Sequence, residues 1–97
     1  MFGTVARMTV KAGELEQLQK VLSDWDGASV DGAIATYVYK PENGTNDIMF
    51  SVLFRDEESH NANARSPRTA EWYQAVRSHL DADPEWWEGP VIVAREY

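Results

Sequence analysis

The hydrophobic residues of this chain change their spacing along the sequence, and the order of these changes limits the folds that it can adopt. Apolar side chains alternate over residues 2–11, which is typical of a β-strand with one buried face. Over residues 14–25 they recur every three or four positions, which predicts a helix with one apolar side. Two more strands are predicted over residues 33–40 and 48–55, and the Asn-Gly turn in the loop between them favours an antiparallel hairpin.

The second half of the chain predicts a broken helix and a last strand. An aspartate that suits a helix N-cap precedes residues 57–65, and a Ser-Pro pair begins a second helical piece that extends to residue 82. The β-branched run at residues 91–94 is predicted as the final strand, with residues 85–90 as a connector that leads to it.

The resulting order β-α-β-β-α-β is that of the ferredoxin-like plan. This is an α+β fold in which a four-stranded antiparallel sheet carries both helical regions on one face. A length of 97 residues suits one domain of this kind, so we expect residues 1–97 to form a single domain.

The other face of this sheet has no helix to cover it, which predicts a homodimer. Alternate side chains of a strand point to opposite faces. The set expected to face the helices is Ala6, Met8, Phe50, Val52 and Phe54. The set then expected to point away is Val5, Met49 and Leu53, with either Tyr37 and Tyr39 or Ile34 and Val38 from the second strand. Because apolar residues in such number should not all face water, we expect two copies to pack sheet against sheet; the alternative is a monomer with a partly apolar face.

The charge balance and the residue usage exclude several classes of partner. With 9 Lys and Arg against 16 Asp and Glu, the net charge is −7, and no basic stripe exists for nucleic acid or anionic lipid. Cysteine is absent, so no disulfide framework or thiolate metal site is expected. No apolar run approaches the roughly 20 residues that span a bilayer, and the first residues lack a signal-peptide pattern. We therefore expect a cytoplasmic protein. Arg7 is expected to lie near a strand end and to pair with a glutamate; the alternative is that it points into the barrel, where it needs a carboxylate partner or a ligand oxygen.

Three segments carry a family resemblance. They are residues 11–14 (Lys-Ala-Gly-Glu), residues 50–56 (Phe-Ser-Val-Leu-Phe-Arg-Asp) and residues 63–67 (Asn-Ala-Arg-Ser-Pro). Together they resemble the antibiotic biosynthesis monooxygenase family, and the resemblance covers nearly the whole chain. It implies a dimeric α+β barrel. The family includes cofactor-free oxygenases of polyketide phenols, haem-degrading enzymes and quinol monooxygenases, so the resemblance alone does not select one activity.

The positions that form the site in known members of this family carry other residues here. In the members that degrade haem, an asparagine, a tryptophan and a histidine form the site, and the similar positions are Ala6, Phe54 and Asn63. Because an amide does not ligate haem iron as an imidazole does, this pattern disfavours haem degradation. In the cofactor-free phenol oxygenases an asparagine, a tryptophan and a tyrosine carry the site, and the similar positions are Phe50, Phe54 and His60. His60 offers a proton-transfer group where the tyrosine sits.

The two histidines are the candidate bases, because imidazole exchanges protons near neutral pH. His60 lies three residues before Asn63, so both side chains lie on one side of a helix. We predict a general base and an amide donor there, able to remove a phenol proton and to hold the oxyanion. The alternative is two exposed polar residues on a helix surface. His79 is the other candidate catalytic residue, and the wide separation of the two histidines along the chain predicts no metal site.

The aromatic residues supply the candidate substrate-binding positions, which are Phe50, Phe54, Trp72, Tyr73 and Trp86. We expect an aromatic wall around a flat ligand, with His79 as a polar group at its edge. The alternatives are that the phenylalanines and Tyr73 belong to the core and that the tryptophans pack at a dimer contact. Neighbouring residues of a strand point opposite ways, so Trp86 and Trp87 cannot both face one core.

Three functions are compatible with these candidates. The first is a cofactor-independent monooxygenase of a phenol or quinol: a deprotonated substrate reduces dioxygen itself, so neither flavin nor metal is required. The second is a non-catalytic dimer of the same fold that binds a small aromatic or isoprenoid ligand or acts as an accessory protein. The third is a purely structural dimer whose acidic surface contacts another protein.

Overall fold

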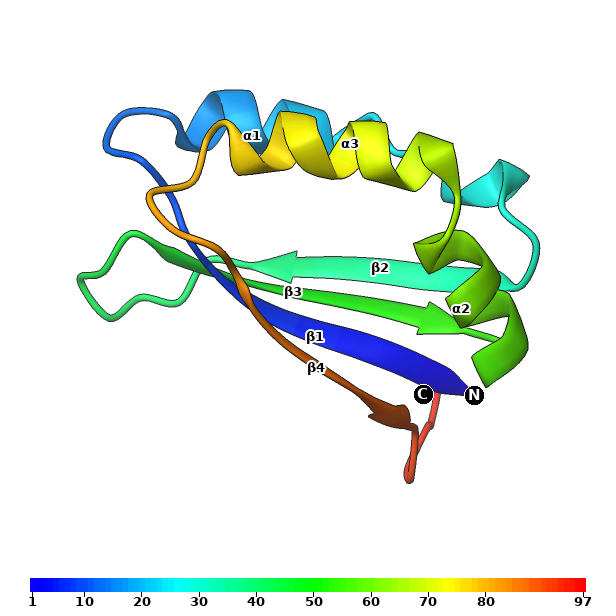
Figure 1. The fold of residues 1–97 in the computed structure, drawn as a ribbon. Helices are drawn as coiled ribbons and strands as arrows, with labels where there is room; N and C mark the ends of the chain where they lie inside the picture. Colours follow the sequence, from blue (N-terminus) through cyan, green and yellow to red (C-terminus); the bar gives the residue numbers. More distant parts are fainter.

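The computed structural model describes residues 1–97, which form one antiparallel sheet covered by helices on one face (Figure 1). The elements in chain order are β1 (Phe2–Thr9), α1 (Leu15–Ser23), the 3₁₀ turn η1 (Gly27–Ser29), β2 (Ala33–Tyr39), β3 (Asp47–Phe54), α2 (Glu57–Ala64), α3 (Pro67–Arg77) and β4 (Glu85–Pro90). The strand order in the sheet is β2-β3-β1-β4, and the predicted ferredoxin-like α+β fold is confirmed. None of the helices combines the length and the hydropathy needed to cross a membrane.

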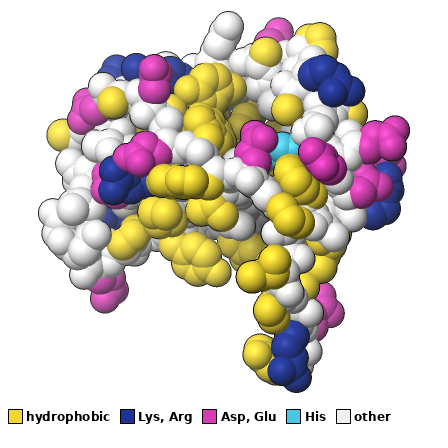
Figure 2. Space-filling model, turned by 60° about the horizontal axis from the view of Figure 1, so that its bottom comes forward, with side chains coloured by type: hydrophobic (Ala, Val, Ile, Leu, Met, Phe, Trp, Pro, Cys, Tyr) yellow, Lys and Arg dark blue, Asp and Glu magenta, His cyan; other side chains and the backbone are white.

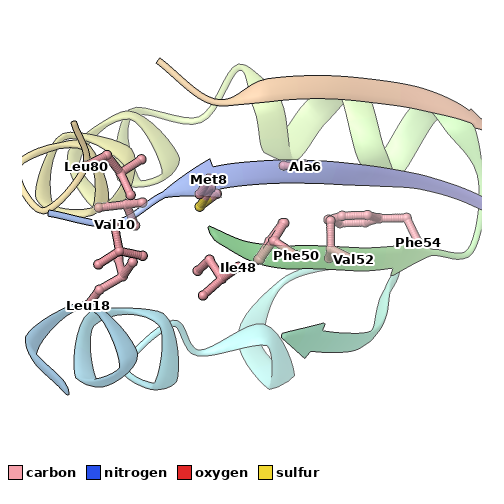
Figure 3. Packing of buried hydrophobic residues seen from close by; sticks show 10 residues of the cluster. Ala6, Met8, Val10, Leu18, Ile48, Phe50, Val52, Phe54 and Leu80 are labelled. Carbon is pink, nitrogen blue, oxygen red and sulfur yellow. The ribbon is translucent and has the colours of Figure 1, made fainter. Parts of the chain in front are cut away.

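The core lies between the two central strands and the helices above them (Figure 3). In the β1–β3 ladder Ala6 pairs with Phe50 and Met8 with Ile48, and directly opposed residues point to the same face of a sheet. These side chains meet Leu18 of α1. The complete buried cluster is Ala6, Met8, Val10, Leu18, Ile48, Phe50, Val52, Phe54, Val76 and Leu80. The parity predicted to face the helices is therefore confirmed.

The register of β2 decides between the two parities that the sequence left open for the outer face. Val38 pairs with Phe50, so it lies on the helix side, whereas Tyr37 and Tyr39 pair with Ser51 and Met49 on the outer side. The outer face also carries four apolar side chains from the other strands, which are Val5, Met49, Leu53 and Trp87. Figure 2 shows hydrophobic side chains gathered on this side of the molecule. Both tyrosines and Trp87 are more than half exposed in the single chain.

The last strand is displaced from its predicted place. Residues 85–90, predicted as a connector, form β4, and the prediction of a strand over residues 91–94 is wrong. The β1–β4 register explains the difference, because it pairs Phe2 with Pro90 and so brings β4 to the end of β1. Val91 still donates its backbone N–H to the carbonyl of Met1, but the residues after it pass beyond β1. Ladder partners, rather than β-branched side chains, determine where the strand lies.

The long helical piece is also shorter than predicted. α3 ends at Arg77 instead of residue 82, because His79 and Leu80 donate their N–H groups to carbonyls three residues earlier and tighten the chain into a turn. Leu80 then forms an isolated bridge with Val10 and enters the core. The helix therefore ends before Leu80, which allows Leu80 to pack against Val10 in the core.

Gly32 fixes the entry into β2 against the start of α2. Its φ is +80°, a left-handed conformation that favours glycine. Its carbonyl accepts the backbone N–H of Arg55 at 2.7 Å, and a Cβ placed on it would lie 2.4 Å from the Cβ of Ser59. The Arg55 side chain adds an exposed ion pair with Asp31, N···O 3.2 Å. A close approach of the loop to α2 therefore requires glycine at this position.

Replacing Gly32 with alanine is expected to lower the free energy of unfolding by about 2–4 kcal/mol, because it adds left-handed strain and a steric overlap with Ser59. Gly44→Ala is the matched control: Gly44 has a φ of +77°, but no atom lies within 4 Å of the added Cβ. It should lose only the strain, about 1–2 kcal/mol. Urea unfolding of both variants measures the difference, and equal losses would show that the contact with Ser59 is unimportant.

Candidate functional site

A cavity of about 550 Å³ lies between the sheet and the helices α2 and α3. Of the residues predicted for the site, it brings together His60, Asn63, Phe50, Phe54, Trp72, Tyr73 and Trp86. The further lining residues are Thr4, Trp25, Val52, Ala64, Thr69, Ala70 and Glu88. The wall is mostly apolar with a few polar groups, as in sites for small organic ligands.

Aromatic rings from β3, α3, β4 and the loop after α1 form the walls of this cavity. Phe50 of β3 lies 6.0 Å from Trp72 of α3, measured between ring centroids, and Tyr73 lies 5.9 Å from Trp86 of β4. Trp25, which follows α1, extends the wall with a 6.2 Å contact to Trp72. These are the distances of interacting aromatic pairs, so the rings hold one another in place. A flat aromatic ligand fits such a surface.

The two tryptophans of β4 point to opposite faces, as their adjacency requires. Trp86 pairs with Ala6 and lines the cavity, whereas Trp87 pairs with Val5 on the outer face. Trp72 is held by a hydrogen bond from its Nε1 to the carbonyl of Val21, 3.3 Å. The indole of Trp72 thus links α3 to α1 and also borders the cavity.

Tyr73 keeps its phenol proton near neutral pH. Burial raises the pKa of Tyr73, and the carboxylate of Asp83 raises it further, against a smaller opposite effect of Arg77. A neutral phenol donates a hydrogen bond. Tyr73 is therefore a donor at the cavity rather than a base.

His60 is a buried residue, only 5% exposed, and both of its ring nitrogens have partners. Its Nε2 lies 2.6 Å from the hydroxyl oxygen of Thr4, and its Nδ1 lies 3.0 Å from Oδ1 of Asn61. The rings of Phe2 and Phe54 meet the imidazole edge-on, with centroid distances of 4.9 and 5.5 Å. The imidazole is thus fixed in orientation, and it is not the exposed surface group of the alternative interpretation.

Asn63 presents an amide donor to the same cavity. Its Oδ1 accepts a hydrogen bond from the hydroxyl of Thr69, 3.1 Å. Asn63 lines the cavity, and its amide nitrogen donates no hydrogen bond to the protein. An amide N–H in this position can stabilise an oxyanion on a ligand.

The N-cap of α2 positions His60 and Asn63. Asp56 accepts the backbone N–H of Ser59 at 2.8 Å, which satisfies one of the free donors of the first turn. This bond, a further hydrogen bond with Ser59 and one from Arg55 lower the pKa of the exposed Asp56 carboxyl below its ordinary value of 3.8. The cap is strongest while Asp56 is ionised.

Acid is therefore expected to weaken the fold in part through Asp56. Because its pKa is lower in the folded state, its contribution is fully present above the ordinary pKa of 3.8 and is lost as the pH falls below that value. In Asp56→Asn the amide oxygen still caps the helix but does not titrate. Urea unfolding at pH 7 and at about pH 3 should show a smaller loss for Asp56→Asn than for the unsubstituted protein. Equal losses would contradict this role of the carboxylate.

The structure does not bring His79 to the cavity. Its Nδ1 lies 2.9 Å from Oε1 of Glu14, and this contact joins the chain after α3 to the start of α1. Arg7 pairs with Glu85 on the outer face, which confirms the expected glutamate partner. No group of three or more His, Asp and Glu side chains is arranged to hold a metal ion.

Thr4, Trp25 and Glu88 are cavity residues that sequence reasoning missed. Thr4 had a visible signal, because it is a polar residue on the strand parity of Ala6 and Met8. Glu88 had no such signal, because the sequence predicts the last strand over residues 91–94 instead of 85–90. Trp25 reaches the cavity from a loop, and hydrophobic periodicity does not define the path of a loop. Trp25 also borders a second groove of about 690 Å³ between α1 and β2, which contains neither histidine.

Known proteins share this fold with the chain, although their sequences differ from it at most positions. A family model described as antibiotic biosynthesis monooxygenase matches residues 1–77. A mutant of SnoaB, a cofactor-independent oxygenase from Streptomyces nogalater, is similar with a TM-score of 0.84 and 14% identity over 96% of this chain and 94% of that one. A conserved protein from Methanosarcina mazei Go1 is similar with a TM-score of 0.81 and 19% identity over 91% and 89%. At these identities the structural likeness shows the fold alone. No curated protein matches the sequence.

Proposed function

Since the chain belongs to the antibiotic biosynthesis monooxygenase family, we propose that it is a cofactor-independent monooxygenase of a phenol or hydroquinone. One observation carries the proposal: a buried imidazole and a free amide donor meet at an aromatic cavity. His60 supplies the base and Asn63 the donor to the oxyanion. The aromatic ring of the ligand would pack against the side chains of Phe50, Trp72 and Trp86.

The chemistry needs an electron-rich anion rather than an added redox group. Removal of the phenol proton gives a phenolate, which transfers one electron to dioxygen. The resulting radical and superoxide combine to form a C–O bond, and after protonation the hydroperoxide loses water where the carbon bears a hydrogen, leaving a carbonyl. One oxygen atom then remains in the product and the other leaves as water. The protein contributes the proton acceptor, the oxyanion donor and exclusion of bulk water.

Dioxygen consumption with a panel of phenols and hydroquinones tests this proposal. We expect at least one compound to be consumed with uptake of dioxygen in the absence of flavin and added metal. Quenching of tryptophan fluorescence reports binding independently, because Trp25, Trp72 and Trp86 line the cavity. A ligand that quenches this fluorescence without any uptake of dioxygen would favour the second candidate, a binding protein of the same fold.

We also propose a homodimer formed through the outer sheet face. Support comes from Tyr37, Tyr39 and Trp87, which are 54%, 61% and 53% exposed in the single chain and lie on one face with Val5 and Leu53. Apolar burial stabilises an interface by about 25 cal/mol per Å². Sedimentation at micromolar concentration should therefore give a dimer, and a monomer there would contradict the proposal.

A further inference from the structure

Both nitrogens of the candidate base are engaged within the protein. Nε2 of His60 lies 2.6 Å from Oγ1 of Thr4, and Nδ1 lies 3.0 Å from Oδ1 of Asn61. Phe2 and Phe54 pack edge-on against the ring, so the imidazole cannot turn one nitrogen toward a ligand without breaking these contacts. A proton that reaches His60 from the cavity must therefore pass through one of its hydrogen-bond partners.

The direction of these hydrogen bonds shows which of the two partners can pass a proton to His60. An amide oxygen only accepts, so Nδ1 of His60 donates to Asn61 and carries the ring proton. Nε2 is then the acceptor, and the hydroxyl of Thr4 donates to it. A hydroxyl that donates one hydrogen bond keeps lone pairs to accept another. Thr4 lines the cavity, so this acceptor is available to a ligand hydroxyl.

We propose that Thr4 is a further catalytic residue, which accepts the ligand proton and relays it to His60. This inference rests on the proposed monooxygenase function. The ligand O–H bond breaks as a Thr4 O–H bond forms, and the original Thr4 O–H bond breaks as an N–H bond forms on Nε2. The products are a phenolate, an unchanged threonine and an imidazolium.

A hydrogen bond to Asn61 holds the ring in place during the transfer. Oδ1 of Asn61 accepts the hydrogen bond from Nδ1–H whether the ring is neutral or protonated. Glu88, directly opposite Thr4 in the β1–β4 ladder, is the one carboxylate among the cavity-lining residues. Thr4 is 6% exposed and His60 5%, so bulk water does not compete strongly for the relay.

Threonine-to-valine substitution tests the relay, because it removes the hydroxyl at nearly constant shape. We expect Thr4→Val to lower kcat by about 10²-fold, the usual contribution of a positioned proton-transfer group, with a smaller change in KM. Thr4→Ser keeps the hydroxyl and should restore most of kcat. Thr9→Val is the matched control in the same strand, because Thr9 bonds Asp47 at the surface and does not line the cavity.

Nitrogen-15 NMR of the histidine rings gives a readout that needs no substrate. In the unsubstituted protein the His60 signals should show a proton on Nδ1 and a hydrogen-bonded, unprotonated Nε2, and Thr4→Val should shift Nε2 while Thr9→Val should not. A proton on Nε2 would overturn the relay whatever the activity. An unchanged kcat in Thr4→Val would overturn the relay but would leave the proposed monooxygenase function standing. Absence of dioxygen uptake with every phenol would overturn the proposed function and the relay with it.

Discussion

Replacing His60 with alanine is expected to lower dioxygen consumption by at least about 10²-fold, because removal of a general base leaves the phenol protonated at neutral pH. The neutral phenol is a poor one-electron donor, so the reaction with dioxygen slows even when the ligand still binds. The loss should appear in kcat. Tryptophan quenching should show that the cavity still takes up the ligand, since the aromatic walls remain in place.

His79→Ala is the matched substitution at the second histidine. His79 pairs with Glu14 outside the cavity, so this variant should keep most of the activity. Urea unfolding of both variants separates catalysis from stability, because His60→Ala also leaves the Thr4 hydroxyl without its partner. Equal losses of activity in two equally stable variants would contradict the assignment of the base to His60.

Replacing Leu53 with glutamate is expected to dissociate the proposed dimer. Leu53 lies on the outer face, between Gly3 of β1 and Ala35 of β2. In a symmetric sheet-to-sheet contact each copy would bury one new carboxylate without a partner, at a cost of several kcal/mol per ion. Association should weaken by at least about 10³-fold, equivalent to about 4 kcal/mol. Sedimentation over a range of concentrations measures this change.

Leu15→Glu is the control for this substitution. Leu15 begins α1 on the helix side, and it borders the second groove rather than the outer face. The same change of charge there should leave the dimer intact. A dimeric Leu53→Glu variant would show that the copies associate through another surface, and its unfolding curve would show whether the chain itself remains folded.

The candidate site illustrates how far sequence reasoning extends. His60 and Asn63 were paired by their spacing on one helix, and the structure places both at the cavity. His79 is equally able to act as a base by its side-chain chemistry, but the turn after Arg77 places its imidazole beside Glu14. Thr4 is distant from His60 along the chain, and only the packing of α2 against β1 brings their side chains together. Side-chain chemistry can be recognised in a sequence, whereas long-range partners cannot.

The sequence by itself determined the order of elements, the parity of β1 and β3 and the cap at Asp56, because these follow from local periodicity and local hydrogen bonding. The tertiary structure decided the position of β4, the face on which Tyr37 and Tyr39 lie, and the partners of His60. Strand register depends on ladder hydrogen bonds between segments far apart in the chain, and a shift of one residue exchanges the two faces. The same shift would exchange Trp86 with Trp87, and with it the wall of the cavity with the outer face.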